Sequence, residues 1–230
     1  MIVRHRDRSM LSDRFETLRI EAFSDAVFAI AITLLVLEIK VPHDGSPSGL
    51  SHALVHLWPS YLAFLTSFCT IGMMWINHHR LFTLIQTADE TLIAINLVLL
   101  LFITWVPFPT AVLAAYLRHP EEWSAAVLYS GTFVIIAIIF NVLWWHGMRC
   151  GHVPHKGWAA HPITRQYVQG PVLYAVMFLV GLVNGTACLL LSTLLAIYFS
   201  LSPRLWERGQ GWQGASTVRR ETGGIHDSGE

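Results

Sequence analysis

The chain has 230 residues, of which 53% are hydrophobic and only 13% are charged, and its formal net charge is zero. So few charges cannot coat a soluble globule of this size, and the composition therefore indicates an integral membrane protein. Lys, Arg, Asp and Glu are absent from Gly45 to His79, Thr91 to Leu117, Trp123 to Met148 and Gln166 to Pro203. Each segment exceeds the roughly 20 residues that cross a bilayer as a helix, which excludes a soluble enzyme domain for most of the chain.

The first predicted helix covers residues 15–41. Ser12 and Asp13 are candidate N-cap residues, and Pro42 follows the expected end of the helix. An Arg-rich run over residues 4–14 precedes it, in place of the short apolar stretch of a signal peptide. No cleavage is therefore expected.

Three further spans are predicted at Leu50 to His79, Thr91 to Leu117 and Trp123 to Met148. Pro107-Phe108-Pro109 should break the second of these near its outer end. The segment from Gln166 to Pro203 is long enough either for two short helices that turn at Asn184-Gly185 or for one overlong tilted helix.

The distribution of basic residues favours the two short helices. With six spans and an inner N-terminus, 13 of the 15 positive residues lie inside, and only Lys40 and Arg118 lie outside. The inner set is Arg4, Arg6, Arg8, Arg14, Arg19, Arg80, Arg149, Lys156, Arg165, Arg204, Arg208, Arg219 and Arg220. Five spans would place the four C-terminal arginines outside, against the positive-inside rule.

The predicted fold class is thus an all-α integral membrane protein with six transmembrane helices per subunit. We expect a cytoplasmic N-terminal segment over 1–14, a six-span domain over 15–203 and a disordered cytoplasmic tail over 204–230. The expected location is the plasma membrane, with both termini cytoplasmic.

The first helix carries a stripe that faces one direction. At 100° per residue, Ile30 and Leu37 lie about 20° apart, and Thr33 lies about 60° from Ile30. Asp25 lies about 140° from Ile30 and so points toward neighbouring helices. A carboxylate near the bilayer is costly unless it is paired or hydrated, so Asp25 needs a partner.

Candidate partners lie at the inner end of the second span, where Trp75, His78, His79 and Phe82 follow i, i+3, i+4, i+7 spacing. Two interpretations remain open for Asp25 and these residues. One is a network that holds helices together. The other is a proton-sensing or proton-relay role.

The motif Arg-x-x-x-Phe-Ser-Asp, formed here by Arg19, Phe23, Ser24 and Asp25, resembles that of the transmembrane protein 175 family of potassium channels. The segments 75–82, 96–100 and 107–110 are similar to that family's second and third helices. The resemblance covers the first half of the chain, whereas the second half agrees only in the number of spans.

This resemblance implies a homotetramer in a lipid bilayer, with the first helices lining a central pore for potassium, which would be the permeant ligand. Carried over by position, the narrowest hydrophobic layer falls on Ile30, the family's threonine on Thr33 and a second hydrophobic layer on Leu37. Arg19, Phe23, Ser24, Asp25, Trp75 and His78 would form the motif and assembly network. The chain has no Thr-Val-Gly-Tyr-Gly-like carbonyl filter, and no cofactor or nucleic acid partner is expected.

The leading alternative is a proton-coupled secondary transporter that uses Asp25 and His78. An intramembrane enzyme is not expected, because the spans contain no Ser/His, paired-Asp or His-Glu-x-x-His arrangement. His52 and His56 have i, i+4 spacing but no evident third ligand, so no metal site is assigned. The histidines of the loop that follows the fourth span, His152, His155 and His161, are expected at the membrane interface.

Overall fold

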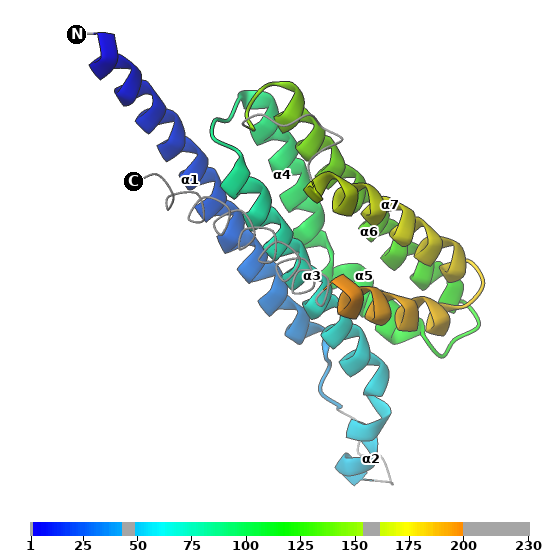
Figure 1. Cartoon of the computed structure of the whole chain (residues 1–230). Coiled ribbons are helices and arrows are strands. Elements are labelled where there is room, and N and C mark those ends of the chain that lie inside the picture. Colours follow the sequence, from blue (N-terminus) through cyan, green and yellow to red (C-terminus); the bar gives the residue numbers. More distant parts are fainter. Residues whose placement is uncertain (1, 43–48, 154–161, 200–230) are drawn as a thin grey trace, which may run out of the picture.

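The protein is described by a computed structural model that covers residues 2–42, 49–153 and 162–199, without the side chains of residues 2–15, 162, 163, 165 and 166. Within these ranges every regular element is a helix (Figure 1). The all-α class that the composition predicts is therefore confirmed for the described residues. The predicted tail over 204–230 lies outside them.

The first predicted span is formed by α1 (Ile2–Leu34) and a short 3-10 turn, η1 (Leu35–Glu38). The helix begins at Ile2, so the predicted start at Ser12 or Asp13 is wrong. No Gly or Pro interrupts residues 2–14, so nothing in that segment prevents the helix from continuing. The N-terminal part of α1 projects beyond the other helices (Figure 1).

The second and third predicted spans are each divided into two helices. The second consists of α2 (Gly49–His56) and α3 (Trp58–Leu84), with Pro59 in the first turn of α3. The third consists of α4 (Glu90–Trp105) and α5 (Pro107–Tyr116). The predicted break at Pro107 is confirmed, since proline cannot donate the backbone hydrogen bond that a continuous helix requires there.

The second half of the chain contains α6 (Glu122–Arg149), α7 (Pro162–Gly181) and a further helix, Gly185–Phe199. The chain turns between the last two at 182–184, so the segment after 166 forms two short helices rather than one long one. Among the described residues, four helical segments are long and apolar enough to cross a membrane: Glu16–Glu38, Trp58–Leu84, Glu90–Tyr116 and Glu122–Arg149.

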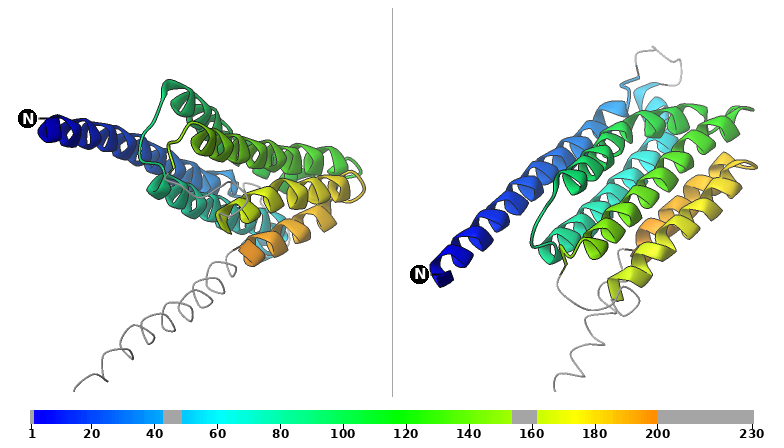
Figure 2. Two further views of the ribbon diagram at one scale, coloured as in Figure 1. Left: turned by 45° about the horizontal axis from the view of Figure 1, so that its top comes forward. Right: turned by 90° about the horizontal axis from the view of Figure 1, so that it is seen from above.

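The helices form a bundle in which α1 lies along one edge. It packs against α3 and α4, whereas α7 packs against α6 on the other side (Figure 2). Hydroxyl groups in the interior pair with one another: Ser67 lies 2.9 Å from Thr110 and 3.1 Å from the Tyr129 hydroxyl, which lies 3.3 Å from Ser192. Buried polar groups are thereby satisfied across four helices.

Candidate functional site

The helix α1 has two faces of different character. Ser24, Phe28 and Ala31 are completely or almost completely buried, and their spacing of four and three residues places them on one side of α1, followed by the buried Leu35 at the start of η1. This side packs against the bundle. Only 22% of the α1 span is buried, against 39 to 50% of the other three long spans.

Ile30 and Thr33, two residues of the predicted stripe, lie on the opposite, exposed side of α1, and the third residue, Leu37, is exposed in η1. The side chains of Ile30 and Leu37 are 56% and 64% exposed, and Thr33 is also exposed. The hydroxyl of Thr33 donates a hydrogen bond to the Ile30 carbonyl oxygen at 2.8 Å. The Thr33 oxygen therefore retains lone pairs that can accept a hydrogen bond or contact a cation.

Asp25 has a direct partner on α3. The indole nitrogen of Trp75 donates a hydrogen bond to the Asp25 carboxylate at 2.8 Å. One turn closer to the N-terminus, Glu21 lies 2.7 Å from His79 Nδ1. Two carboxylates of α1 thus bind two aromatic side chains of α3, separated by one helical turn on each helix.

A second polar connection is buried and includes α4. Asn96 donates a hydrogen bond to Ser24 Oγ at 2.9 Å, and its carbonyl oxygen lies 2.9 Å from His78 Nε2. Ser24, His78 and Asn96 are all at most 1% exposed. This chain of contacts joins α1, α3 and α4 within the apolar core.

Asn96 was not identified as a site residue from the sequence. The sequence offers one indication of its importance, because Asn96 carries a polar carboxamide within the apolar run Ile93-Ala94-Ile95-Asn96-Leu97-Val98. A lone polar side chain in such a run requires a partner in the bundle interior.

Arg19 and Phe23 are the two motif residues that the structure does not join to these contacts. Arg19 is exposed, and Phe23 is 56% exposed. No hydrogen bond or ion pair connects Arg19 with another residue in the described part of the chain. Both side chains are therefore available to a neighbouring molecule.

The residues of the transporter hypothesis have different partners. Asp25 binds Trp75, whereas His78 binds Asn96 and packs between the rings of Phe28 and Phe82, with ring centroids 5.3 and 4.5 Å away. Among the described residues there is no direct hydrogen bond between Asp25 and His78.

The remaining histidines that the sequence analysis considered lie away from this network where the structure describes them. His52 and His56 lie 3.0 Å apart through their Nε2 atoms, with Arg118 3.4 Å from His56 Nδ1. His152 is half-buried beside Asp89, and its expected place at the membrane interface stays a prediction. His155 and His161 lie outside the described residues.

Comparison with known proteins gives consistent matches. Residues 19–107 match the family described as the endosomal/lysosomal potassium channel TMEM175. A protein of Chamaesiphon minutus named as a potassium channel is 50% identical over 194 residues, which cover 82% of this chain and 96% of that protein. A Streptomyces collinus protein, also named as a potassium channel, is 44% identical over 191 residues, covering 81% of this chain and 93% of that protein.

The fold is also similar to a solved structure. The crystal structure of a lysosomal potassium-selective channel TMEM175 homolog from Chamaesiphon minutus superimposes with a TM-score of 0.75 at 51% sequence identity. The match covers 81% of this chain and 97% of that chain.

Proposed function

This chain belongs to the TMEM175 family of potassium channels, and from that premise we propose that it forms a homotetramer whose four α1 helices line a central potassium pore. The relatives are named as channels, and the chain is not an enzyme.

The observation that carries this proposal is the division of α1 into a packed face and an exposed face. Phe28 and Ala31 are buried against the subunit's own bundle, whereas Ile30 and Thr33 face away from it. A helix at the edge of the bundle can meet copies of itself around a symmetry axis without giving up its intrasubunit contacts. The apolar face is then covered by neighbouring subunits.

The proposed gate consists of rings of Ile30 and Leu37 side chains. Such rings present only hydrocarbon and cannot replace the hydration shell of an ion, so a narrow constriction blocks conduction by dewetting. Conduction then requires that the rings separate enough to admit water. No carbonyl filter takes part.

Thr33 is proposed to contribute to selectivity from its place between the two apolar layers. Its hydroxyl proton is already committed to the Ile30 carbonyl, so the oxygen presents lone pairs on the exposed side. Four such oxygens around an axis form a ring of neutral ligands for a partly dehydrated potassium ion. Potassium is the proposed permeant ion.

The assembly network comprises Arg19, Phe23, Ser24, Asp25, Trp75 and His78. The buried bond chain through Asn96 and the Asp25–Trp75 bond fix the rotation of α1 on its own bundle. Arg19 and Phe23 extend from the same turns of α1 and are proposed to contact the adjacent subunit. The network thus sets the direction in which the pore stripe faces.

The proposed topology has six spans in the plasma membrane and both termini in the cytoplasm. Four spans are the long helices, and α7 with the Gly185–Phe199 helix supplies the other two. The proposed division is a cytoplasmic segment over 1–14, a channel domain over 15–203 and a cytoplasmic tail over 204–230. The uneven distribution of basic residues supports this arrangement.

Planar-bilayer recording of the purified chain in a potassium gradient tests the function. We expect unitary currents that reverse near the potassium equilibrium potential, with a smaller permeability for sodium. Saturable, slow uptake that depends on a proton gradient, without unitary currents, would instead support the transporter that uses Asp25 and His78.

A further inference from the structure

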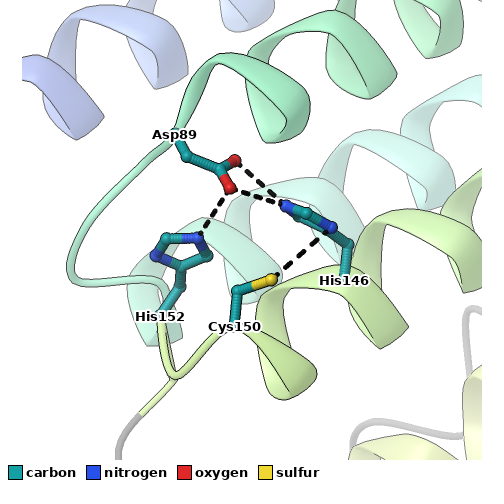
Figure 3. A group of neighbouring side chains, drawn as sticks. All are labelled: Asp89, His146, Cys150 and His152. Atoms are coloured by element: carbon teal, nitrogen blue, oxygen red, sulfur yellow. Dashed lines mark hydrogen bonds and ion pairs between the residues drawn. The ribbon is translucent and has the colours of Figure 1, made fainter.

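Four metal-ligating side chains from separate parts of the chain meet at one end of the bundle. Asp89 precedes α4, His146 and Cys150 lie at the end of α6, and His152 lies in the segment that follows (Figure 3). One donor atom from each residue lies within 4.8 Å of each of the others. None of these residues belongs to the proposed pore or assembly network.

Local structure explains how the four side chains converge. Asp89 is the N-cap of α4, and its carboxylate accepts a hydrogen bond from the Leu92 amide at 2.7 Å. His146 and Cys150 are four residues apart and therefore share one face of the helix end. Gly151 has φ +77°, which lets the chain turn back after α6 and brings His152 to the same point.

The donor distances are close to those around a bound metal. His146 Nε2 lies 2.9 Å from Asp89 Oδ2, and His152 Nε2 lies 3.4 Å from the same oxygen. Cys150 Sγ lies 3.8 Å from the other ring nitrogen of His146, Nδ1, so it approaches the cluster from the far side of the nitrogen that faces Asp89. In a tetrahedral zinc site, bonds of about 2.0 to 2.3 Å place the donors about 3.3 to 3.8 Å apart. The four donor atoms lie within 4.8 Å of one another, so metal binding requires the side chains, Cys150 above all, to move closer together.

The orientation of His152 provides a second, independent observation. Its Nδ1 lies 2.7 Å from the Thr87 hydroxyl, which turns its Nε2 toward Asp89. This Nε2 is buried and has no hydrogen bond with any residue in the described ranges. A hydrogen bond from one ring nitrogen that directs the other nitrogen toward a metal is the usual second-shell arrangement of histidine ligands.

The charge of Asp89 is also suitable for a cation. An aspartate carboxyl is ionised at neutral pH, so Asp89 supplies a negative charge that attracts a divalent cation.

We propose that Asp89, His146, Cys150 and His152 bind one Zn²⁺-class divalent metal per chain. The mixture of carboxylate, imidazole and thiol donors suits zinc or cobalt and does not suit magnesium, which prefers oxygen ligands. The metal joins the start of α4 to the end of α6 and to the loop after it. Binding only to the folded chain stabilises that fold.

Zinc titration of the full-length purified protein in detergent, after treatment with a chelator, tests the site. The His52→Gln background removes the separate His52–His56 pair from the measurement. We expect one zinc ion per chain and a rise in Tm that magnesium does not reproduce. Failure to bind zinc at one ion per chain would overturn the proposal.

Two substitutions identify the ligands. His152→Gln and Cys150→Ser should each weaken zinc affinity by more than about tenfold, since even the loss of a second-shell partner costs at least that much. His119→Gln, a change at an exposed histidine outside the cluster, is the matched control and should leave the affinity unchanged. Unchanged affinity in His152→Gln would show that zinc binds elsewhere.

Cobalt reports the coordination directly. Co²⁺ bound to these four ligands should show tetrahedral d–d absorption together with a thiolate-to-cobalt charge-transfer band, and the latter band should disappear in Cys150→Ser. Cobalt binding by the unsubstituted chain without the charge-transfer band would overturn Cys150 as a ligand.

Discussion

Ile30 and Thr33 differ in what they offer to water, although both are exposed on the same side of α1. The isoleucine presents only hydrocarbon, whereas the threonine presents an oxygen whose proton is used within the helix. The two residues are therefore expected to perform separable tasks, with Ile30 controlling wetting and Thr33 contributing to ion discrimination.

Ile30→Asn should increase resting potassium current and lower the discrimination against sodium, because asparagine offers water a hydrogen-bonding wall of similar length. Single-channel recording in asymmetric potassium and sodium solutions measures both effects. Ile138→Asn is the matched control, since Ile138 is 49% exposed, close to the 56% of Ile30, but lies on α6. An assembled Ile30→Asn protein with unchanged conductance and permeability ratio would mean that another helix lines the pore.

Thr33→Ala should weaken the preference for potassium over sodium without producing a constant leak, because it removes the oxygen but leaves the Ile30 layer in place. Thr33→Ser keeps the hydroxyl and should retain most of the selectivity. Reversal potentials under bi-ionic conditions distinguish the three proteins. If Thr33→Ala and the unsubstituted chain have the same potassium-to-sodium permeability ratio, Thr33 does not contribute to selectivity.

At the scale of the helices, the attachment of α1 to α3 depends on a few polar contacts in addition to apolar packing. The Asp25–Trp75 bond and the buried Ser24–Asn96–His78 chain lie on adjacent residues of α1. Rotation of α1 about its axis would break both connections. The direction of the exposed stripe is therefore coupled to these bonds.

Asp25→Ala should destabilise the assembled protein by about 1 to 3 kcal/mol, because the Trp75 indole then loses its charged acceptor. Trp75→Phe and the double variant complete a double-mutant cycle, and the double variant should cost less than the sum of the two single changes. Size-exclusion chromatography and thermal unfolding in mild detergent are the measurements. Glu38→Ala is the control, because the Glu38–Lys40 pair is a surface ion pair of little value.

If Asp25→Ala leaves the assembly intact and instead changes ion selectivity, Asp25 belongs to the conduction path and not to the packing of α1 on α3.

The order of helices was predictable from local sequence, whereas the pairing of polar side chains was not. The break at Pro107 depends on residues at that position, so the sequence indicates it directly, whereas the turn before Gly185 was favoured over one long helix only by the distribution of basic residues. The contact between Ser24 and Asn96 joins residues 72 positions apart and depends on how α1 and α4 are aligned.

The cluster around Asp89 was missed for the same reason. Asp89 and His146 are 57 residues apart, and the sequence places them near two different loops without showing that the loops meet. The His146–Cys150 spacing was the available signal, but it supplies only two donors. Asp89 and His152 supply the other two donors, and their approach depends on the packing of α4 against α6.

At the scale of the whole molecule, the topology predicts which loops an impermeant reagent can reach. Ser51→Cys should be labelled from outside intact cells, and Gln86→Cys should be labelled only after permeabilisation. Both are made in a Cys150→Ser background, because Cys150 is exposed and predicted to lie inside. The reverse labelling pattern would invert the proposed orientation.

The tetrameric pore predicts contacts between copies of α1 that a subunit surrounded by lipid would not make. In a narrow pore, cysteines at position 37 of different subunits come within the Cα separation of about 7 Å that a disulfide requires. Leu37→Cys, with Cys69 and Cys150 replaced by serine, should therefore form disulfide-linked dimers on oxidation. Ile138→Cys, equally made on an exposed apolar position, should remain monomeric on a denaturing gel. Native mass spectrometry should count four chains before oxidation. Four-chain assemblies that cross-link through position 138 and not through position 37 would place α6, rather than α1, at the symmetry axis.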